Sequence, residues 1–351
     1  REGKMVVGQF GLSVPDFLDN FDGDIEEGDV LLTSDPYSCG AAISHANDWL
    51  VVMPIFHEGT LVGWSSQFGH MSDVGGKTPA SMPTDARTIF EDGIVIPPIK
   101  IYKKGVLQDD SLLIILNQVR KPEWNRADLN GLVAACRTAG RRVQEMCDRF
   151  GASTYNSALD ALLERNYRAM KVLLSKVFKD GETISFEDYI DDDGRGNGPY
   201  LLKLSLTRKG EKVILDFSGS APQAEGPINY FINENLVRMF FGIYMITVAD
   251  PQILWNDGFY PLVDVIIPDD SFWQPRYPAA LNARNHGVGR IFDLFGGLLG
   301  QGNPDLLNAA GFSSSPHFMY SGTYTQGKNK GEWFQLYSIG FGGIPGRQNG
   351  D

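Results

Sequence analysis

Two copies of a His-x-x-Asp motif stand on either side of one pair of predicted strands, and this arrangement most constrains the chain. His45 and Asp48 form the first copy, and His70 and Asp73 form the second. One such copy alone is usually a pair of polar loop residues whose hydrogen bonds are satisfied by the backbone. Two copies beside the same strands instead favour a shared site.

The residues between the motifs predict a β-hairpin. Residues 49–56 (WLVVMPIF) and 61–67 (LVGWSSQ) are rich in β-branched and aromatic side chains, and residues 57–60 (HEGT) supply a turn. Asp48 enters the first strand and His70 leaves the second. Antiparallel pairing therefore returns both side chains to the same end of the hairpin.

His45, Asp48 and His70 form a candidate metal-binding set. Imidazole nitrogen and carboxylate oxygen suit manganese, zinc, iron or cobalt, and three protein ligands leave coordination positions open for a substrate. The same ligands suit each of these metals, so the metal's identity stays open. Asp73 is expected to orient a ligand histidine from behind. His57 is expected to be dispensable, because a strand rise of about 3.3 Å per residue puts it roughly 20 Å away.

Composition indicates a folded protein and disfavours several partners. The 351 residues are 42% hydrophobic and 21% charged, which suits a full core with room for two domains. A net charge of −12 disfavours nucleic acid and anionic membranes, because binding their phosphates needs a basic patch. Three cysteines without a C-x-x-C motif argue against a disulfide framework and favour a reducing cytoplasm. The sequence has no apolar run long enough to predict a membrane span.

The order of the patterns predicts an α+β fold with mixed, largely antiparallel sheets. Strict alternation of strands and helices is absent, which argues against a doubly wound sheet or a TIM barrel. A long amphipathic helix ending at Gly151 and a second over residues 155–179 predict an antiparallel pair. The acidic, glycine-rich loop at 190–198 predicts two closely packed lobes: 1–190, with the metal site and the helical pair, and 199–351, a second α+β unit. The first and last residues indicate a fragment of a longer subunit.

A glycine-rich segment at residues 75–78 (GGKT) resembles the end of a phosphate-binding loop without fulfilling that motif. The motif's first glycine would fall at Met71, and Pro79 and Pro83 prevent the helix whose N-terminus should hold the phosphate. ATP binding at this segment is therefore rejected. The glycines are expected to let the backbone approach the metal site closely.

A second polar run precedes a predicted helix near Val288. It contains Arg284, Asn285 and His286. A loop before a helix N-terminus favours anions, which makes these side chains candidates for substrate contacts. The alternative, an ordinary helix start whose polar groups are satisfied locally, stays open.

Two long segments resemble the hydantoinase B family: DVLLTSDPYSCGAAISHANDW (residues 29–49) and GHMSDVGGKTPASMPTDARTIFEDGIVIPPIKIYKKG (residues 69–105). DFSGS at 216–220, followed by GPINY, resembles a further block of that family. The family includes subunits of N-methylhydantoinases, 5-oxoprolinases, caprolactamase-like enzymes, and acetone and acetophenone carboxylases. Asp35 and His45 are further apart than in the hydantoinase pattern DPYxGGTHxxD, and the segment between them is similar to the ketone carboxylase branch.

The resemblance implies a subunit of an ATP-dependent ketone carboxylase of the acetone or acetophenone type, a ligase that is active only with partner subunits. In that branch the residues matching His45, Asp48 and His70 hold manganese. The metal would stabilise the enolate for carbon–carbon bond formation with CO2 derived from bicarbonate. ATP and magnesium would be used in a hydantoinase A-like partner, not in this chain, and a small zinc-binding subunit would complete the assembly.

Two alternatives remain open. One is a subunit of an ATP-dependent cyclic amide hydrolase of the hydantoinase, oxoprolinase or caprolactamase type, in which the metal activates water. The altered segment before His45 argues against this alternative without excluding it. The other is a structural partner in which the metal only braces the fold.

Overall fold

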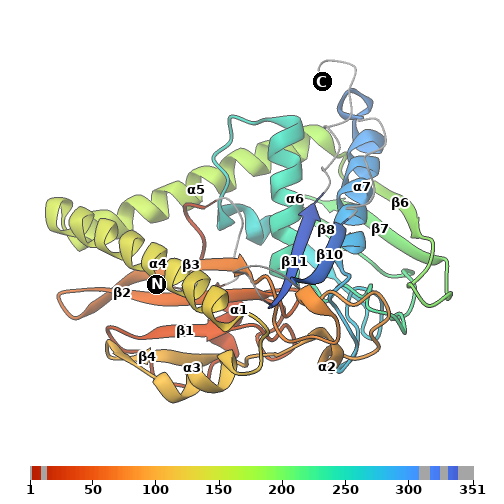
Figure 1. Cartoon of the computed structure of the whole chain (residues 1–351). Coiled ribbons are helices and arrows are strands. Elements are labelled where there is room, and N and C mark those ends of the chain that lie inside the picture. The colour runs from red at the N-terminus through yellow and green to blue at the C-terminus, as the bar shows by residue number, and fades with distance from the viewer. Residues whose placement is uncertain (1, 9–13, 308–316, 325–330, 339–351) are drawn as a thin grey trace.

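The computed structural model describes residues 2–8, 14–307, 317–324 and 331–338. In this part of the chain the strands form a five-stranded sheet, a four-stranded sheet and a two-stranded hairpin, with helices packed on the larger sheets (Figure 1). Of the pairings between the described strands, all but one are antiparallel. This confirms the predicted α+β class with largely antiparallel sheets.

The five-stranded sheet contains β1 (Val30–Thr33), β2 (Asp48–His57), β3 (Thr60–His70), β4 (Ile99–Lys103) and β5 (Val106–Leu107). The strand order is β3-β2-β1-β4-β5, so β1 and β2 lie inside the sheet. Their side chains are buried almost throughout. A strand buried on both faces reads as a nearly continuous apolar run, as β2 does.

Side chains of β2 alternate between two cores. Trp49 belongs to the core formed with α3 (Asp109–Leu116) and α4 (Pro122–Phe150). Leu50 belongs to the core formed with α1 (Val14–Asp19). Because successive side chains of a strand point to opposite faces, the sheet is a layer between these helices. Asp48 shares the face of Leu50.

The predicted pair of long helices is present. Helix α4 ends at Phe150, and α5 (Ala152–Val177) begins after the single residue Gly151, whose φ is 83°. Glycine adopts this left-handed conformation without steric cost. Helix α4 lies along β2 and β3 and also contacts α5 (Figure 1). The pair therefore connects the first sheet to the rest of the chain.

The four-stranded sheet contains β6 (Thr183–Ile190), β7 (Tyr200–Lys209), β8 (Lys212–Asp216) and β9 (Val263–Ile266), in that order. The one parallel pairing joins β8 to β9. The sequence analysis did not identify β6, although its alternating exposure is typical of a strand with one solvated face. The 3-10 helix η2 (Asp257–Leu262) leads directly into β9.

Two further helices fill the space beside this second sheet. They are α6 (Glu234–Ala249), which contacts β9, and α7 (Asn285–Gly302), which contacts β6, β7 and α6. The largest core of the described residues lies here and extends from Met170 to Leu299. The remaining elements are η1 (Pro79–Ser81), α2 (Ile89–Asp92), η3 (Pro304–Leu306), β10 (His317–Tyr324) and β11 (Gly331–Ser338).

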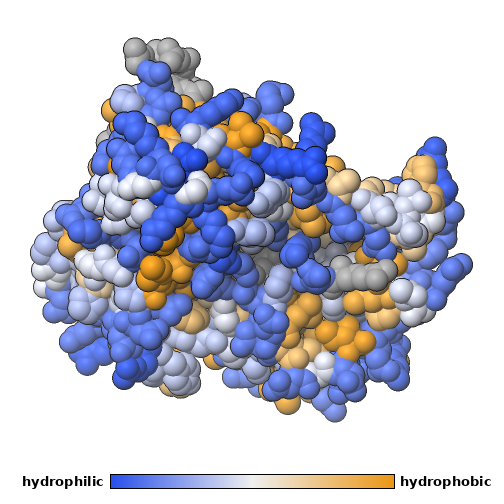
Figure 2. Space-filling view, turned by 180° about the vertical axis from the view of Figure 1, so that it is seen from behind, coloured by the Kyte–Doolittle hydropathy of each residue, from blue (hydrophilic) through white to orange (hydrophobic). Residues whose placement is uncertain are grey.

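The predicted division into lobes 1–190 and 199–351 stays a prediction. The large core already begins inside α5, before the proposed boundary, and side chains from both parts meet at the candidate site described below. The face shown in Figure 2 is mostly hydrophilic, with small separate hydrophobic patches. Within the described residues, no helix is long and apolar enough to cross a membrane.

Candidate metal centre

The predicted hairpin is present and places Asp48 opposite His70. Strands β2 and β3 pair from Asp48 with His70 at one end to His57 with Thr60 at the other. Directly paired residues in an antiparallel sheet project on the same face. Asp48 and His70 therefore leave the sheet together, on the face that Leu50 occupies.

His45 joins these two residues from the loop before β2. Its Nε2 atom lies 3.1 Å from Oδ2 of Asp48, and its ring centroid lies 5.0 Å from that of His70. His45 and Asp48 are buried, whereas His70 is exposed at the edge of the group. The structure thus brings the three predicted ligands to one end of the hairpin.

Arg284 completes the group from the second half of the chain. Its Nη2 atom donates to Oδ2 of Asp48 at 3.1 Å, the same oxygen that faces His45. Its Nε atom is buried and has no hydrogen-bond partner. Arg284 directly precedes α7, so its side chain lies at the positive end of that helix dipole.

The electrostatics of the pair favour a neutral imidazole beside an ionised carboxylate. Burial lowers the pKa of His45 to about 4, and the charge of Arg284 acts in the same direction. Burial opposes the charge on Asp48, but the attractions of His45, Arg284 and His70 hold its pKa below its ordinary value. At neutral pH these are the protonation states that metal ligation requires.

A buried amide network holds the loop before α7 against the hairpin end. Nδ2 of Asn282 donates to Oδ1 of Asn47 at 3.0 Å and to the backbone oxygens of Ser81 and Asp92. The carboxylate of Asp92 in turn accepts from the backbone N–H groups of Leu281, at 2.7 Å, and Asn282, at 3.2 Å. These contacts fix the backbone beside Arg284 across more than 180 residues of sequence.

The donor types of His45, Asp48 and His70 are those that suit a divalent ion, and their role as ligands stays a prediction. Both ring nitrogens of buried His45 lack a hydrogen-bond partner, although Nε2 lies within ion-pair distance of Asp48. Buried polar atoms are rarely left so unless they serve an unfilled role. Among the described residues, no three His, Cys, Asp or Glu side chains are placed to hold an ion as they stand.

Asp73 lies just beyond β3 and organises a loop. Its oxygens accept from the backbone N–H groups of Gly75, Ala80 and Arg120, and from the Arg120 guanidinium at 2.8 Å. The side chain is fully buried. These bonds attach the end of β3 to the segment between α3 and α4, and the predicted role of orienting a histidine stays a prediction.

The glycines of the GGKT segment serve this loop and its neighbours. A Cβ on Gly75 would stand 2.1 Å from the backbone oxygen of Gln118, and one on Gly76 would stand 2.5 Å from that of Asp92. Backbone does approach closely here, as expected for glycine. The close approach is to other backbone segments and not to the candidate ligands.

His57 lies in the turn end of the hairpin, as predicted. It pairs with Thr60 in the last register position, at the opposite end from Asp48 and His70. Its Nε2 lies 2.9 Å from Oδ1 of Asp148 on α4. The hairpin therefore has a His–Asp pair at each end.

The polar run before α7 was flagged in the sequence, and Arg284 is the member whose contact with the candidate ligands is described. Asn285 and His286 are the first residues of α7.

Tyr230 is a neighbour of the site that the sequence analysis did not identify. It is buried, and burial raises its pKa. The charge of Arg284 lowers this pKa, and the charge of Asp48 raises it. The sequence signal was the GPINY block in which Tyr230 stands.

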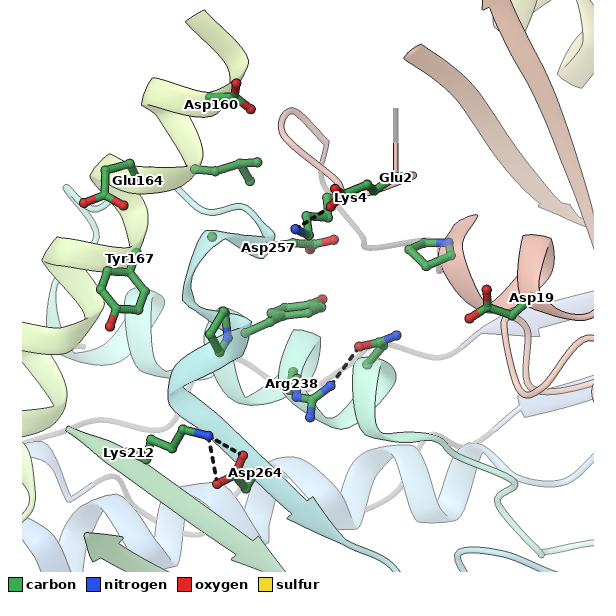
Figure 3. A pocket seen from close by; sticks show the side chains of 16 residues that line it. Glu2, Lys4, Asp19, Asp160, Glu164, Tyr167, Lys212, Arg238, Asp257 and Asp264 are labelled. Atoms are coloured by element: carbon green, nitrogen blue, oxygen red, sulfur yellow. Dashed lines mark hydrogen bonds and ion pairs between the residues drawn. The ribbon is translucent and has the colours of Figure 1, made fainter. Parts of the chain in front are cut away.

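A separate cavity of about 1040 Å³ lies between α1, α5, α6 and η2 (Figure 3). The described lining does not include the predicted ligands. Two of its lysines are already paired, Lys4 with Glu2 and Lys212 with Asp264. The cavity and the candidate metal centre are thus distinct features of the fold.

Comparison with known proteins finds subunits of a caprolactamase and of an acetophenone carboxylase among the relatives of this chain. The caprolactamase subunit beta of Pseudomonas jessenii is 29% identical over 265 residues, which are 74% of this chain and 43% of that subunit. The acetophenone carboxylase delta subunit of Aromatoleum aromaticum is 28% identical over 219 residues, 60% of this chain and 31% of that subunit. The chain thus spans less than half the length of either relative. Both relatives are named as subunits of larger enzymes.

Two solved structures have a similar fold. The ATP-dependent caprolactamase of Pseudomonas jessenii superposes with a TM-score of 0.83 at 25% identity, over 94% of this chain and 57% of that chain. Nucleotide-free acetone carboxylase superposes with a TM-score of 0.81 at 19% identity, over 92% and 44%, and shows a likeness of fold alone. The profile of the Hydantoinase B/oxoprolinase family matches residues 2–351, and the chain belongs to that family.

Proposed function

We propose that this chain is the metal-binding subunit of an ATP-dependent enzyme, and that its reaction site lies at the end of the β2–β3 hairpin. The observation that carries the proposal is the state of His45. It is 98% buried, both of its ring nitrogens lack a hydrogen-bond partner, and it faces Asp48 and His70. A buried imidazole without hydrogen bonds adds little to the stability of the fold, and its free nitrogens suit it to binding a metal ion.

The metal would be held by His45, Asp48 and His70, and manganese is our first choice over zinc or iron. A divalent ion there would act as a Lewis acid and stabilise the negative charge that develops on an oxygen of the substrate. The chain's own residues set the conditions for that chemistry. Burial keeps His45 neutral, the fixed charges keep Asp48 ionised, and the register of β2 with β3 holds His70 at the same edge.

Of the reactions in the family, we infer ketone carboxylation, in which carbon dioxide derived from bicarbonate joins the carbon next to a ketone. The segment at residues 38–44, between Asp35 and His45, supports this choice because it is similar to the ketone carboxylase branch. The segment leads directly into the site and includes buried Cys39 and Ile43. It lies where it can shape the wall beside the metal.

Hydrolysis of a cyclic amide is the second candidate, and a specific observation favours it. The caprolactamase subunit aligns with 74% of this chain, whereas the acetophenone carboxylase subunit aligns with 60%. In this reading the same three ligands would bind an ion that activates water for attack on an amide already activated with ATP.

Either reaction needs partner subunits. The GGKT segment does not form a phosphate-binding loop, because Ala80 in η1 has φ of 67° and no helix of useful length follows it. We therefore place ATP and magnesium in a hydantoinase A-like partner, and expect a small zinc-binding subunit in the assembly. The names of the relatives as subunits support this arrangement.

The two reactions are separated by incubating the assembled complex with ATP and isotopically labelled bicarbonate plus acetone or acetophenone, and separately with ATP and caprolactam or 5-oxoproline. Carboxylation predicts label in an acid-stable carboxylate that depends on the ketone. If product forms from the lactams and not from the ketones, the reaction of the complex is hydrolysis and the proposal of carboxylation is wrong. ATP-dependent turnover of either kind by this chain without partners would contradict the subunit role.

A further inference from the structure

Arg284 is placed to do more than hold Asp48. Its contact with Asp48 uses Nη2, while Nε is buried without a partner. Nε–H and Nη2–H form one edge of the guanidinium group and point in parallel, which matches the two oxygens of a carboxylate or phosphate. In this structure that edge is therefore only half used.

The charges of the candidate centre leave room for an anion. A divalent ion and Arg284 would together carry three positive charges, and the negative charge among the three ligands is that of Asp48. The neighbouring groups that influence Asp48 are His45, Arg284 and His70, none of which is acidic. A buried site with excess positive charge favours an anionic group on its substrate or product.

The position of Arg284 is also fixed by the fold before any ligand binds. The backbone is fixed just before Arg284: the N–H groups of Leu281 and Asn282 donate to Asp92, and that of Ala283 donates to the Pro227 oxygen at 3.0 Å. The positive end of α7 adds a field of the same sign. The side chain as a whole remains 17% exposed, although Nε itself is buried.

We infer that Arg284 binds an oxyanion of the substrate or product beside the metal ligands. This inference rests on the proposed function and specifies its substrate class. Both candidate reactions end in a carboxylate: carboxylation forms one by joining carbon dioxide to the ketone's carbon, and hydrolysis forms one when water opens the amide. A phosphoryl group from an ATP-activated reactant is the other source of an oxyanion at this position.

The test uses the full chain loaded with Mn²⁺ and two probes, acetate and inorganic phosphate. Their binding is followed through water-proton relaxation by the bound Mn²⁺ and through calorimetry, so that no turnover is needed. The variants are Arg284→Lys, which keeps the charge but not the parallel N–H edge, and Arg284→Gln, which removes both. Arg290→Gln is the matched control, because Arg290 lies on α7, is 20% exposed and pairs with Asp188 at 3.0 Å.

The expected result is that Arg284→Gln and Arg284→Lys still bind Mn²⁺, while their affinity for the probe falls about tenfold or more, the usual effect of losing charge-assisted hydrogen bonds. Arg290→Gln should match the wild type. Dependence of acetate binding on Arg284 identifies the carboxylate as the anion, and dependence of phosphate binding alone identifies the phosphoryl group.

Two outcomes would overturn the inference. One is probe affinity within about twofold of the wild type in both Arg284 variants. The other is loss of Mn²⁺ from Arg284→Lys, because the guanidinium would then only position Asp48. Failure of the wild type to bind Mn²⁺ is a different result, since it removes the proposed function and with it this inference.

Discussion

The β2–β3 hairpin has a histidine–aspartate pair at each end. The distances within the two pairs are similar, but the pairs differ in burial and in hydrogen bonding. His45 and Asp48 lie 3.1 Å apart, and His57 and Asp148 lie 2.9 Å apart. The first pair is buried, with side-chain exposures of 2% and 8%, whereas Asp148 is 71% exposed. The shorter contact is thus at the end where we propose no chemistry.

The comparison shows which observations identify a site. Nε2 of His57 has a hydrogen bond to Asp148, and the His57 side chain is 13% exposed. His45 has no hydrogen-bond partner at either nitrogen, and its carboxylate neighbour is shared with Arg284. Unsatisfied buried donors and acceptors carry a free-energy cost, which a bound ion would relieve. Burial and missing partners therefore discriminate between the two ends, and proximity does not.

Replacement of the two aspartates should give the largest contrast between the ends. Asp48→Ala removes a proposed ligand and leaves the buried Arg284 without its partner, so metal affinity should fall by more than about 100-fold, beyond the usual loss from an outer-shell change. Asp148→Ala is the matched control and should leave affinity unchanged. Competition with a fluorescent chelator measures both. An equal loss of metal affinity in the two variants would contradict the placement of the metal site at the Asp48 end of the hairpin.

Replacement of Asp73, which lies just beyond the buried end of the hairpin, tests how much the hydrogen bonds to this side chain stabilise the protein. Asp73→Ala removes a fully buried carboxylate that accepts from three backbone N–H groups and Arg120. Breaking a buried pair in this way typically costs about 3–5 kcal/mol. Urea unfolding of the metal-free protein should show this loss. Asp85→Ala, which breaks an exposed pair with Lys77, should cost less than about 1 kcal/mol.

The same variants decide the predicted orienting role of Asp73. If Asp73 orients a ligand histidine, the conservative variant Asp73→Asn should lower metal affinity about 10–100-fold, as changes behind metal ligands typically do. If Asp73 only braces the loop, Asp73→Asn should lower stability while the folded protein keeps its metal affinity. Measurement of both quantities on one preparation separates the two roles.

Asp92 behind the buried end should give a pH-dependent effect. Burial raises the pKa of Asp92 to about 7 from its ordinary 3.8. Between about pH 4 and 7 the folded chain keeps a proton that the unfolded chain has released, so this carboxyl lowers the free energy of unfolding as pH rises. Asp92→Asn removes that loss and keeps one oxygen for the N–H groups of Leu281 and Asn282.

The expected result is that the stability of Asp92→Asn relative to the wild type grows from pH 4 to 7 and is constant above pH 7. Urea unfolding at pH 5 and pH 8 is sufficient to detect this difference. A stability difference for Asp92→Asn that does not change with pH would contradict the raised pKa.

The smallest effect is expected from the exposed pair itself. His57→Ala removes a contact to a side chain that is 71% exposed, and surface ion pairs contribute about 0–1 kcal/mol. Urea unfolding should therefore show a change within that range. A loss of several kcal/mol would mean that the turn end of the hairpin is a structural anchor comparable to the buried end.

Local patterns in the sequence predict the hairpin, its register and the two long helices. The β-branched run of β2, the turn before Thr60 and the heptad-like spacing before Gly151 each act within a few residues. Residues that interact over short sequence distances are recoverable from spacing alone. This is why Asp48 and His70 could be paired without a structure.

Contacts across the chain could not be predicted in the same way. Arg284 reaches Asp48 across 236 residues, and Asn282 reaches Asn47 across 235. No periodicity encodes such pairs, because they depend on how the second sheet and α7 pack against the hairpin end. The sequence flagged Arg284 only through its position before a helix. It gave no signal for the partner of Arg284 or for the network around Asp92.

The most direct test of the central claim is the metal content of the purified full chain, measured by elemental analysis for wild type, His70→Ala and His57→Ala in parallel. We expect about one divalent ion per chain in the wild type and in His57→Ala, and almost none in His70→Ala. Because His70 and His57 lie at opposite ends of the same two strands, the pair controls for the fold of the hairpin. Retention of the ion in His70→Ala, with its loss from His57→Ala, would contradict the assignment of the site.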